Sequence, residues 1–207
     1  EVTHEETQVE AAVEKALFGS NISLNLYWGS TLYHLEDLPM PMNALPDVFT
    51  QFRKQVEKMA VVRETFPTPE TIKTDSSLLA TGDFPAYEAL GQEVPEEDER
   101  AVLSFRGGET AGIERLQDYF WEKDCLKAYK KTRNGLLGAD YSSKFSAWLA
   151  LGCLSPRYIY EEVKRYEKLR KKNSSTYWLI FELVWRDYFR FVSHRYGNDL
   201  FKVGGIK

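Results

Sequence analysis

The sequence predicts two structural classes in succession, an α/β segment in residues 1–65 and an all-helical segment in residues 107–207. Residues 5–17 carry apolar side chains at helical spacing, and residues 22–28 alternate between apolar and polar side chains. This order indicates a helix followed by a half-buried strand, as at the C-terminal end of an α/β domain. Beyond Gly107 the apolar residues recur at helical spacing, which indicates an all-α region.

Capping and proline signals predict the boundaries between these elements. Asp47 is expected to cap a helix that ends near Met59. Residues 66–106 are expected to form a long connector, because four prolines and an acidic run interrupt any periodic pattern. At least four helices should follow. The first opens at Gly107 and ends near Tyr129, and a later one opens at Ser155, where a serine cap precedes a proline.

The charge is distributed unevenly along the chain, although its net value is only −4. Residues 1–100 carry 7 lysines and arginines against 19 aspartates and glutamates, whereas residues 127–172 carry 12 against 4. A basic segment of this kind suits an anionic partner. A solvated helix face is the alternative explanation, and it is the favoured one for residues 164–172.

Composition argues against several other classes of protein. No stretch approaches 18 apolar residues and the first residues are acidic, so we expect neither a membrane span nor a secretory signal. Cys125 and Cys153 are isolated, which favours a reducing intracellular setting, whether nucleus, cytoplasm or organelle. The three histidines are scattered, so no metal site is expected.

Residues 177–196 hold more aromatic side chains than a helix needs for packing alone. On a helix, one face carries Glu182, Trp185, Arg186 and Phe189. One interpretation is a core helix with an internal ion pair between Glu182 and Arg186. The other is a ligand-facing surface, because burying a carboxylate and a guanidinium among large aromatic rings is costly unless they serve each other or a ligand.

Residues 142–146 place three serines and a lysine at the start of an apolar helix. Unpaired backbone N–H groups and the positive end of the helix dipole make such a start suitable for an anion, and the hydroxyls would add donors to a diphosphate. Ordinary capping by serine explains the same pattern equally well.

Two longer stretches, GADYSSKFSAWLALGCLSPR and STYWLIFELVWRDYFRF, resemble the flavin-binding helical domain of the photolyase/cryptochrome family. The stretches FRGGETAG and KKTRNGLLG narrow the resemblance to the DASH cryptochromes within that family. The resemblance implies the end of a Rossmann-like α/β antenna domain in residues 1–65 and an interdomain connector in residues 66–106. Residues 107–207 would then be the start of an all-α FAD-binding domain.

The resemblance also implies roles for individual residues. Glu182 and Trp185 would be catalytic, contacting a pyrimidine dimer, and Glu6 would bind an antenna, 5,10-methenyltetrahydrofolate. The residues implied to hold FAD are Tyr129, Ser142, Ser143, Lys144, Phe145 and Ser146, and those implied to contact DNA are Arg133, Arg186 and Phe189.

The implied function is that of a deoxyribodipyrimidine photo-lyase. Excited reduced FAD would transfer an electron to a cyclobutane pyrimidine dimer in DNA, preferably single-stranded DNA, in which a damaged base costs least to extract. The implied protein is a monomer without membrane association. The alternative is a blue-light photoreceptor that signals without repairing DNA, and no residue in the sequence decides between the two.

Overall fold

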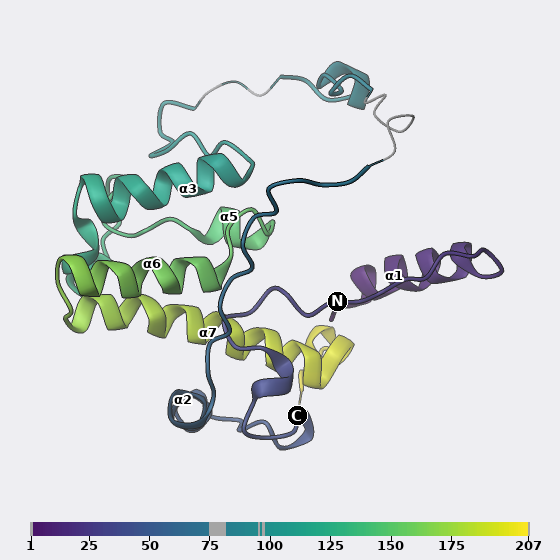
Figure 1. Cartoon of the computed structure of the whole chain (residues 1–207), viewed down its shortest axis with the longest axis horizontal. Helices are drawn as coiled ribbons and strands as arrows, with labels where there is room; N and C mark the ends of the chain where they lie inside the picture. Colours follow the sequence, from purple (N-terminus) through teal and green to yellow (C-terminus); the bar gives the residue numbers. More distant parts are fainter. Residues whose placement is uncertain (1, 75–81, 95, 97, 207) are drawn as a thin grey trace.

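The computed structural model describes residues 2–74, 82–94, 96 and 98–206, and within these residues the protein consists of helices and loops (Figure 1). The α-helices are α1 (His4–Leu17), α2 (Phe49–Met59), α3 (Glu109–Gln117), α4 (Tyr129–Thr132), α5 (Ser146–Ala150), α6 (Pro156–Leu169) and α7 (Ser174–Tyr196). Shorter turns are η1 (Leu35–Asp37), η2 (Met42–Ala44), η4 (Glu88–Leu90), the π-helical turn η5 (Asp118–Glu122), η6 (Cys125–Ala128) and η7 (Gly197–Phe201).

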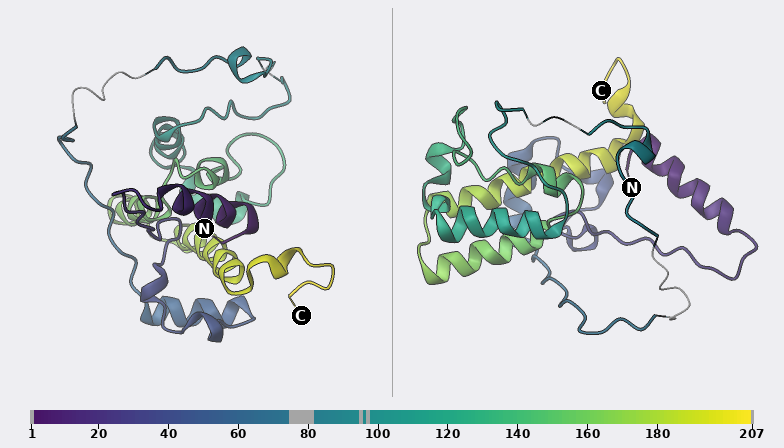
Figure 2. Two further views of the ribbon diagram at one scale, coloured as in Figure 1. Left: turned by 90° about the vertical axis from the view of Figure 1, so that its right-hand side faces the viewer. Right: turned by 90° about the horizontal axis from the view of Figure 1, so that it is seen from above.

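Helix α7 is the element against which the others pack. It contacts α2, α4 and α6 together with turns η2, η6 and η7. In Figure 1, α6 runs beside α7, α3 and α5 lie above this pair, and α2 lies below it, and Figure 2 shows the same bundle from two further sides. Serine and asparagine caps begin α6 and α7: Ser155 accepts hydrogen bonds from first-turn amides of α6, and Asn173 from those of α7. The predicted start of α6 at Ser155 and Pro156 is therefore confirmed.

The core is rich in aromatic rings and surrounds the buried side of α7. The largest fully buried side chains are Tyr119, Tyr166, Phe52, Phe120 and Phe191. Phe120 from η5 meets Tyr166 from α6 at a centroid distance of 6.2 Å, and Phe52 from α2 meets Phe191 from α7 at 5.9 Å. Each of these rings stabilises the fold by about 2–3 kcal/mol through burial, so the packing fixes the position of α7.

A buried carboxylate joins α7 to the N-terminal part of the chain. The side chain of Asp187 has no exposed surface, and its two oxygens accept hydrogen bonds from the backbone amides of Leu32 at 2.9 Å and Tyr33 at 2.8 Å. Nearby, the indole of Trp28 stacks on Phe191 with ring centroids 5.9 Å apart. These contacts hold residues 28–33 against α7.

The predicted α/β class of residues 1–65 is wrong, because the described residues contain no strand and no sheet. Residues 22–28 have no regular secondary structure, and most of their side chains are exposed, with Ile22 63% and Leu26 67% accessible. A strand requires a neighbouring strand to accept and donate its backbone hydrogen bonds, and the described chain offers none here. Alternation in the sequence indicates a half-buried face, but it does not supply the partner. The Rossmann-like assignment fails with the strand.

Two predicted helix boundaries also differ from the structure. The helix expected from Gly107 to Tyr129 is broken, since α3 ends at Gln117 and Asp124 has a left-handed backbone with a φ of 55°. Asp47 does not cap α2, which begins at Phe49 after Val48. Its carboxylate instead lies 3.2 Å from the guanidinium of Arg195 in α7.

The expected connector, residues 66–106, includes residues 75–81, 95 and 97, which lie outside the described residues. In its described part only the short turn η4 is regular. The domain limits at residues 65 and 107 therefore remain predictions.

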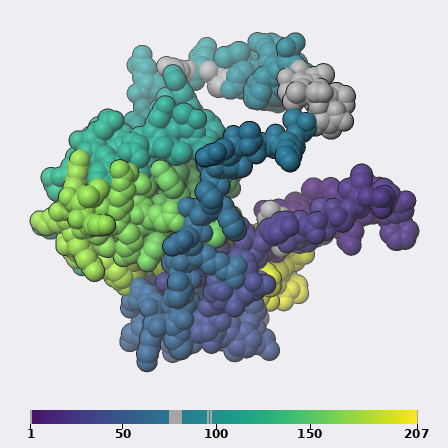
Figure 3. Space-filling model, in the orientation of Figure 1, coloured from purple at the N-terminus to yellow at the C-terminus, as the bar shows by residue number. Residues whose placement is uncertain are grey.

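Helix α1 confirms the helix predicted for residues 5–17, but no residue of it is buried. Val9 is 64% exposed and Val13 42% exposed, so the apolar face of α1 is uncovered. Figure 3 shows α1, in purple, extending away from the main body of the molecule. Its first turn borders the site described below.

Replacing Asp187 with alanine should lower the free energy of unfolding by about 2–5 kcal/mol, because two buried amides lose their acceptors. Urea unfolding followed by circular dichroism measures this. Asp199→Ala is the control, since Asp199 is half-exposed and forms an ion pair with Lys202 at the surface, and it should change stability by less than about 0.5 kcal/mol. Equal effects of the two substitutions would contradict a structural role for Asp187.

The stability that depends on Asp187 should also vary with pH. Burial raises the pKa of Asp187 from its ordinary value of 3.8 to about 7, although the hydrogen bonds from Tyr33 and Leu32 act to lower it. The folded protein then retains a proton that the unfolded chain releases, so the contribution of this group is greatest below pH 4 and falls as the pH rises to about 7. The stability of the wild type relative to Asp187→Asn should decline across this window and level off above it. A constant difference from pH 4 to pH 8 would contradict the prediction.

Candidate functional site

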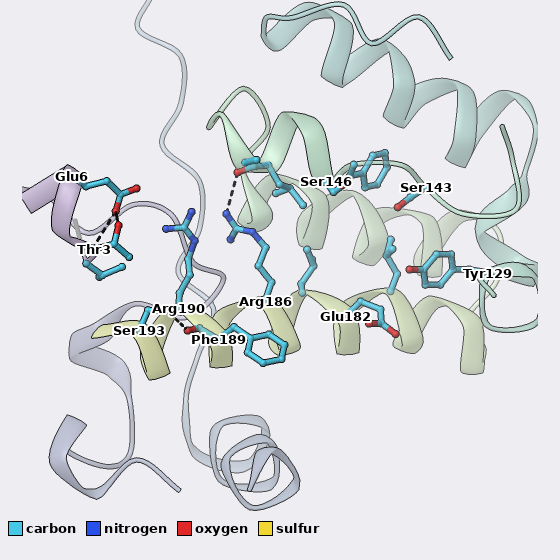
Figure 4. Close-up of a pocket in the computed structure, with 16 residues that line it drawn as sticks. Thr3, Glu6, Tyr129, Ser143, Ser146, Glu182, Arg186, Phe189, Arg190 and Ser193 are labelled. Atoms are coloured by element: carbon cyan, nitrogen blue, oxygen red, sulfur yellow. Dashed lines mark hydrogen bonds between the residues drawn. The ribbon is translucent and has the colours of Figure 1, made fainter. Parts of the chain in front are cut away.

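One cavity of about 630 Å³, here called the α7 cavity, lies between α7 and the segment 143–150 (Figure 4). Glu182, Arg186, Phe189 and Arg190 line it from α7, and Ser143 and Ser146 face them from the other wall. Its other lining residues are Val2, Thr3, Glu6, Tyr129, Phe145, Leu149, Ala150, Leu179, Leu183 and Ser193. The cavity thus combines hydroxyls, two carboxylates, two guanidinium groups and apolar side chains.

The structure brings eight of the twelve sequence-predicted site residues to the α7 cavity: Glu6, Tyr129, Ser143, Phe145, Ser146, Glu182, Arg186 and Phe189. The other four, Arg133, Ser142, Lys144 and Trp185, do not line it. The resemblance therefore selected residues that are scattered in the sequence but gather in space.

The hydroxyl wall of the cavity differs in one respect from the predicted anion site. Helix α5 has only five residues, Ser146–Ala150, so its dipole is small and the hydroxyls of Ser143 and Ser146 are its main polar groups. Lys144 turns away, because its ammonium donates a hydrogen bond to the hydroxyl of Tyr141 and lies 3.6 Å from the centre of that ring. The predicted lysine donor is thus directed elsewhere.

At one end of the cavity, Tyr129 and Phe145 provide a mostly apolar surface. Tyr129 is 6% exposed, and burial raises the pKa of its phenol to about 12, so it is a neutral hydroxyl at physiological pH. Phe145 packs on Phe120 of η5 with ring centroids 5.9 Å apart. Both side chains are held by the core and are rigid lining groups.

Glu182 pairs with Arg133 rather than with Arg186. The distance from Arg133 Nη1 to Glu182 Oε1 is 2.6 Å, and both side chains are about 30% exposed. This close approach is not aligned as a hydrogen bond, so the buried Oε1 has no hydrogen-bond partner among the described residues. The internal Glu182–Arg186 pair of the core interpretation is therefore not formed, and the carboxylate of Glu182 lines the cavity beside Arg133.

The guanidinium of Arg186 has a structural role. Its guanidinium donates hydrogen bonds to the carbonyl of Ser30 and, at 3.1 Å, to the carbonyl of Leu149, and burial lowers its pKa. Arg190, one turn further along α7, makes no hydrogen bond within the described chain. Of the two arginines in the cavity, Arg190 has the guanidinium that is available to an anion. Sequence reasoning missed it, although its spacing of four from Arg186 places it on the same face.

Trp185 is packed behind the cavity within an aromatic cluster. Its ring stacks on Phe49 of α2 at a centroid distance of 3.5 Å and on Phe189 at 5.5 Å. Phe189 is 61% exposed and lines the cavity. The ring that α7 presents is therefore that of Phe189, with Trp185 supporting it.

Glu6 borders the opposite end of the α7 cavity (Figure 4). Its Oε2 accepts a hydrogen bond of 2.8 Å from the hydroxyl of Thr3, and this bond lowers the pKa of the carboxyl. Glu6 also lines a neighbouring cavity of about 320 Å³, together with Gly29, Ser30 and Ser155. The carboxylate of Glu6 thus lines both the α7 cavity and this neighbouring cavity.

The described residues contain no helix long and apolar enough to cross a membrane. They also contain no group of three or more histidine, cysteine, aspartate or glutamate side chains that could hold a metal ion.

The sequence is similar to known proteins along its whole length. The family model described as DNA photolyase matches residues 1–70. The chain is 54% identical over 207 residues to "Cryptochrome DASH" of Gloeobacter violaceus, and this covers 100% of the chain and 41% of that protein. It is 54% identical over 207 residues to "Cryptochrome DASH, chloroplastic/mitochondrial" of Arabidopsis thaliana, covering 99% of the chain and 36% of that protein. The chain thus spans about two fifths of the length of these relatives.

Solved structures agree with this similarity. A crystal structure of a cryptochrome from Synechocystis sp. PCC6803 matches with a TM-score of 0.92 and 55% identity, over 100% of this chain and 42% of that one. A class III photolyase from Agrobacterium tumefaciens matches with a TM-score of 0.60 at 16% identity, over 97% of this chain and 42% of that one. The second match shows a common fold only.

The two cavity arginines should differ in their effect on stability. Arg186→Met should lower the free energy of unfolding by about 2 kcal/mol, because the partly buried carbonyls of Ser30 and Leu149 lose their donor. Arg190→Met should change it by less than about 0.5 kcal/mol, because no hydrogen bond is lost. Chemical denaturation of both variants measures this. A larger loss for Arg190→Met would show that the assignment is reversed.

Proposed function

Because this chain belongs to the photolyase/cryptochrome family and resembles the DASH cryptochromes, we propose that it forms part of a blue-light flavoprotein with FAD in the α7 cavity. The family binds flavin. The observation that carries the proposal is the composition of the cavity, in which the serine hydroxyls face the free guanidinium of Arg190 and the carboxylate of Glu182.

The residues that line the cavity fit this cofactor. Ser143, Ser146 and Arg190 are hydrogen-bond donors of the kind that a diphosphate requires. Leu179 and Leu183 offer an apolar surface suited to a flat ring system. Ser142, Lys144 and Phe145 would support this wall through the backbone and packing, and Tyr129 would close the end of the cavity.

We propose that the activity is repair of cyclobutane pyrimidine dimers, as in a deoxyribodipyrimidine photo-lyase. FAD, when bound and reduced, would supply an electron on absorbing blue light. The protein's own residues would hold the dimer: Glu182 accepts a hydrogen bond from a base edge, and Phe189 offers an aromatic face supported by Trp185. Arg133 would release Glu182 in order to meet a DNA phosphate.

Single-stranded DNA is the proposed substrate form. The basic segment 127–172 carries 12 lysines and arginines against 4 acidic residues, which favours a polyanion. Extracting an unpaired base requires less energy than extracting a paired one. Arg186, which is bonded to backbone carbonyls, would act on DNA only by positioning the α7 surface.

Three further assignments belong to the same proposal. The space beside Glu6 is assigned to an antenna, a reduced folate such as 5,10-methenyltetrahydrofolate. Residues 66–106 are assigned to a connector and residues 107–207 to the flavin-binding region. The protein is proposed to act as a monomer.

The experiment that tests this function uses the protein at the full length that its gene encodes. Its absorption spectrum should show flavin bands, and illumination with blue light should repair dimers in single-stranded DNA faster than in duplex DNA. Flavin bands without repair of either substrate would support the photoreceptor alternative. A protein without flavin bands would contradict both functions.

Glu182→Gln should reduce the rate of dimer repair at least about tenfold while leaving the flavin content unchanged, because an uncharged amide with only one acceptor oxygen replaces the carboxylate. Glu57→Gln is a matched control outside the cavity. Glu57 also pairs with an arginine, Arg53, at 2.6 Å and with similar exposure. Flavin loss in Glu182→Gln would show that the carboxylate is structural, and repair at the wild-type rate would remove it from the mechanism.

A further inference from the structure

Arg115 of α3 is a buried cation that the sequence analysis did not single out. Its side chain is 5% exposed, and it does not line the α7 cavity. All three guanidinium nitrogens donate hydrogen bonds: Nε to Ser143 O at 3.0 Å, Nη1 to Asp118 Oδ2 at 2.8 Å and Asp140 Oδ1 at 3.0 Å, and Nη2 to Ala139 O at 3.0 Å and Ser142 O at 3.2 Å. A buried guanidinium with this many partners fixes whatever it contacts.

Four of the five acceptors lie in one loop, residues 139–143. This loop runs directly into the hydroxyl wall of the α7 cavity, since Ser143 is its last residue and lines the cavity. Three of the four acceptors are backbone carbonyls, so the guanidinium sets the path of the main chain. It therefore determines where the hydroxyl of Ser143 is presented.

The backbone beside this loop is in a conformation that requires support. Lys144 has a φ of 61°, in the left-handed region that side chains other than glycine rarely adopt. Such a residue persists only where its surroundings determine the backbone on both sides. Arg115 fixes the backbone before Lys144 through its hydrogen bond to Ser143 O, and the packing of Phe145 on Phe120 fixes the backbone after Lys144.

The support for Arg115 is itself rigid. The guanidinium carbon lies 5.1 Å from the centre of the Tyr119 ring, which has no exposed surface. Tyr119 belongs to the π-helical turn η5, and Asp118 of the same turn accepts from Arg115. Lys123 lies 3.0 Å from Asp118 and 3.1 Å from Asp140, so each carboxylate meets two cations.

We propose that Arg115 is a positioning residue for phosphate recognition: its fork holds the 139–143 loop so that Ser143 meets the phosphates of the cofactor. This rests on the proposed binding of FAD in the α7 cavity. The planar guanidinium is essential for holding the loop, because three carbonyls and two carboxylates accept its hydrogen bonds from fixed directions. A lysine keeps the charge but has only three donors on one nitrogen, and it cannot reach the same set.

The test uses the full-length protein freed of cofactor and titrated with FAD and, separately, with riboflavin, which has no phosphate. Arg115→Met should weaken binding of FAD at least about tenfold and binding of riboflavin less than about twofold, because only the phosphate end is misplaced. Arg115→Lys should also weaken FAD binding, but with stability nearer to that of the wild type. If Arg115→Met does not fold, the FAD affinity of Arg115→Lys tests the proposal.

Arg170→Met is the control. Arg170 also donates to backbone carbonyls, those of Phe120 and Trp121, but it lies outside the cavity, and its variant should bind FAD like the wild type. Wild-type FAD affinity in Arg115→Lys, or an equal loss of FAD and riboflavin in Arg115→Met, would overturn the proposal. A wild-type protein that binds neither ligand would instead contradict the proposed function.

Discussion

The hydrogen bonds from the amides of Leu32 and Tyr33 to Asp187 are the interaction on which the arrangement of this protein depends. They are made in a fully buried place, where an unmatched carboxylate or amide is costly, so neither side can move without the other. Through them the N-terminal segment is fixed to the middle of α7. Arg186, the neighbour of Asp187, then reaches the carbonyl of Ser30 from the same segment.

This anchoring divides α7 into two faces. Asp187, Tyr188 and Phe191 are buried against the core, whereas Glu182 and Phe189 lie on the cavity side. The charges that are costly to bury are thereby either satisfied by backbone groups or turned toward the cavity. The opposite wall obtains its order from a separate source, the buried guanidinium of Arg115.

The sequence predicted the long helices well, because their information is local. The serine cap before Pro156 and the aromatic pattern of residues 177–196 lie within the helices that they predict. The strand at residues 22–28 failed since alternation cannot report whether a second strand is present. The roles of Asp187 and Arg115 were missed because their partners are largely backbone atoms, which every residue has and which no sequence pattern therefore marks. The partners of Asp187 also lie more than 150 positions away in the sequence. The resemblance identified Glu182, but the spacing within the helix suggested Arg186 as its ion-pair partner. The actual partner, Arg133, lies outside α7.

The two hydrogen bonds of Arg186 differ in how far they reach along the chain, and this bears on the order of folding. The bond to Leu149 closes a loop of 37 residues, whereas the bond to Ser30 closes one of 156. The longer closure costs about 1.3 kcal/mol more in chain entropy. Contacts that are near in sequence form sooner on average, so both walls of the α7 cavity assemble from a single continuous region before residues 28–33 dock. The part of the cavity between α7 and the segment 143–150 is in this sense expected to form early, and the end that Val2, Thr3 and Glu6 line is expected to form late.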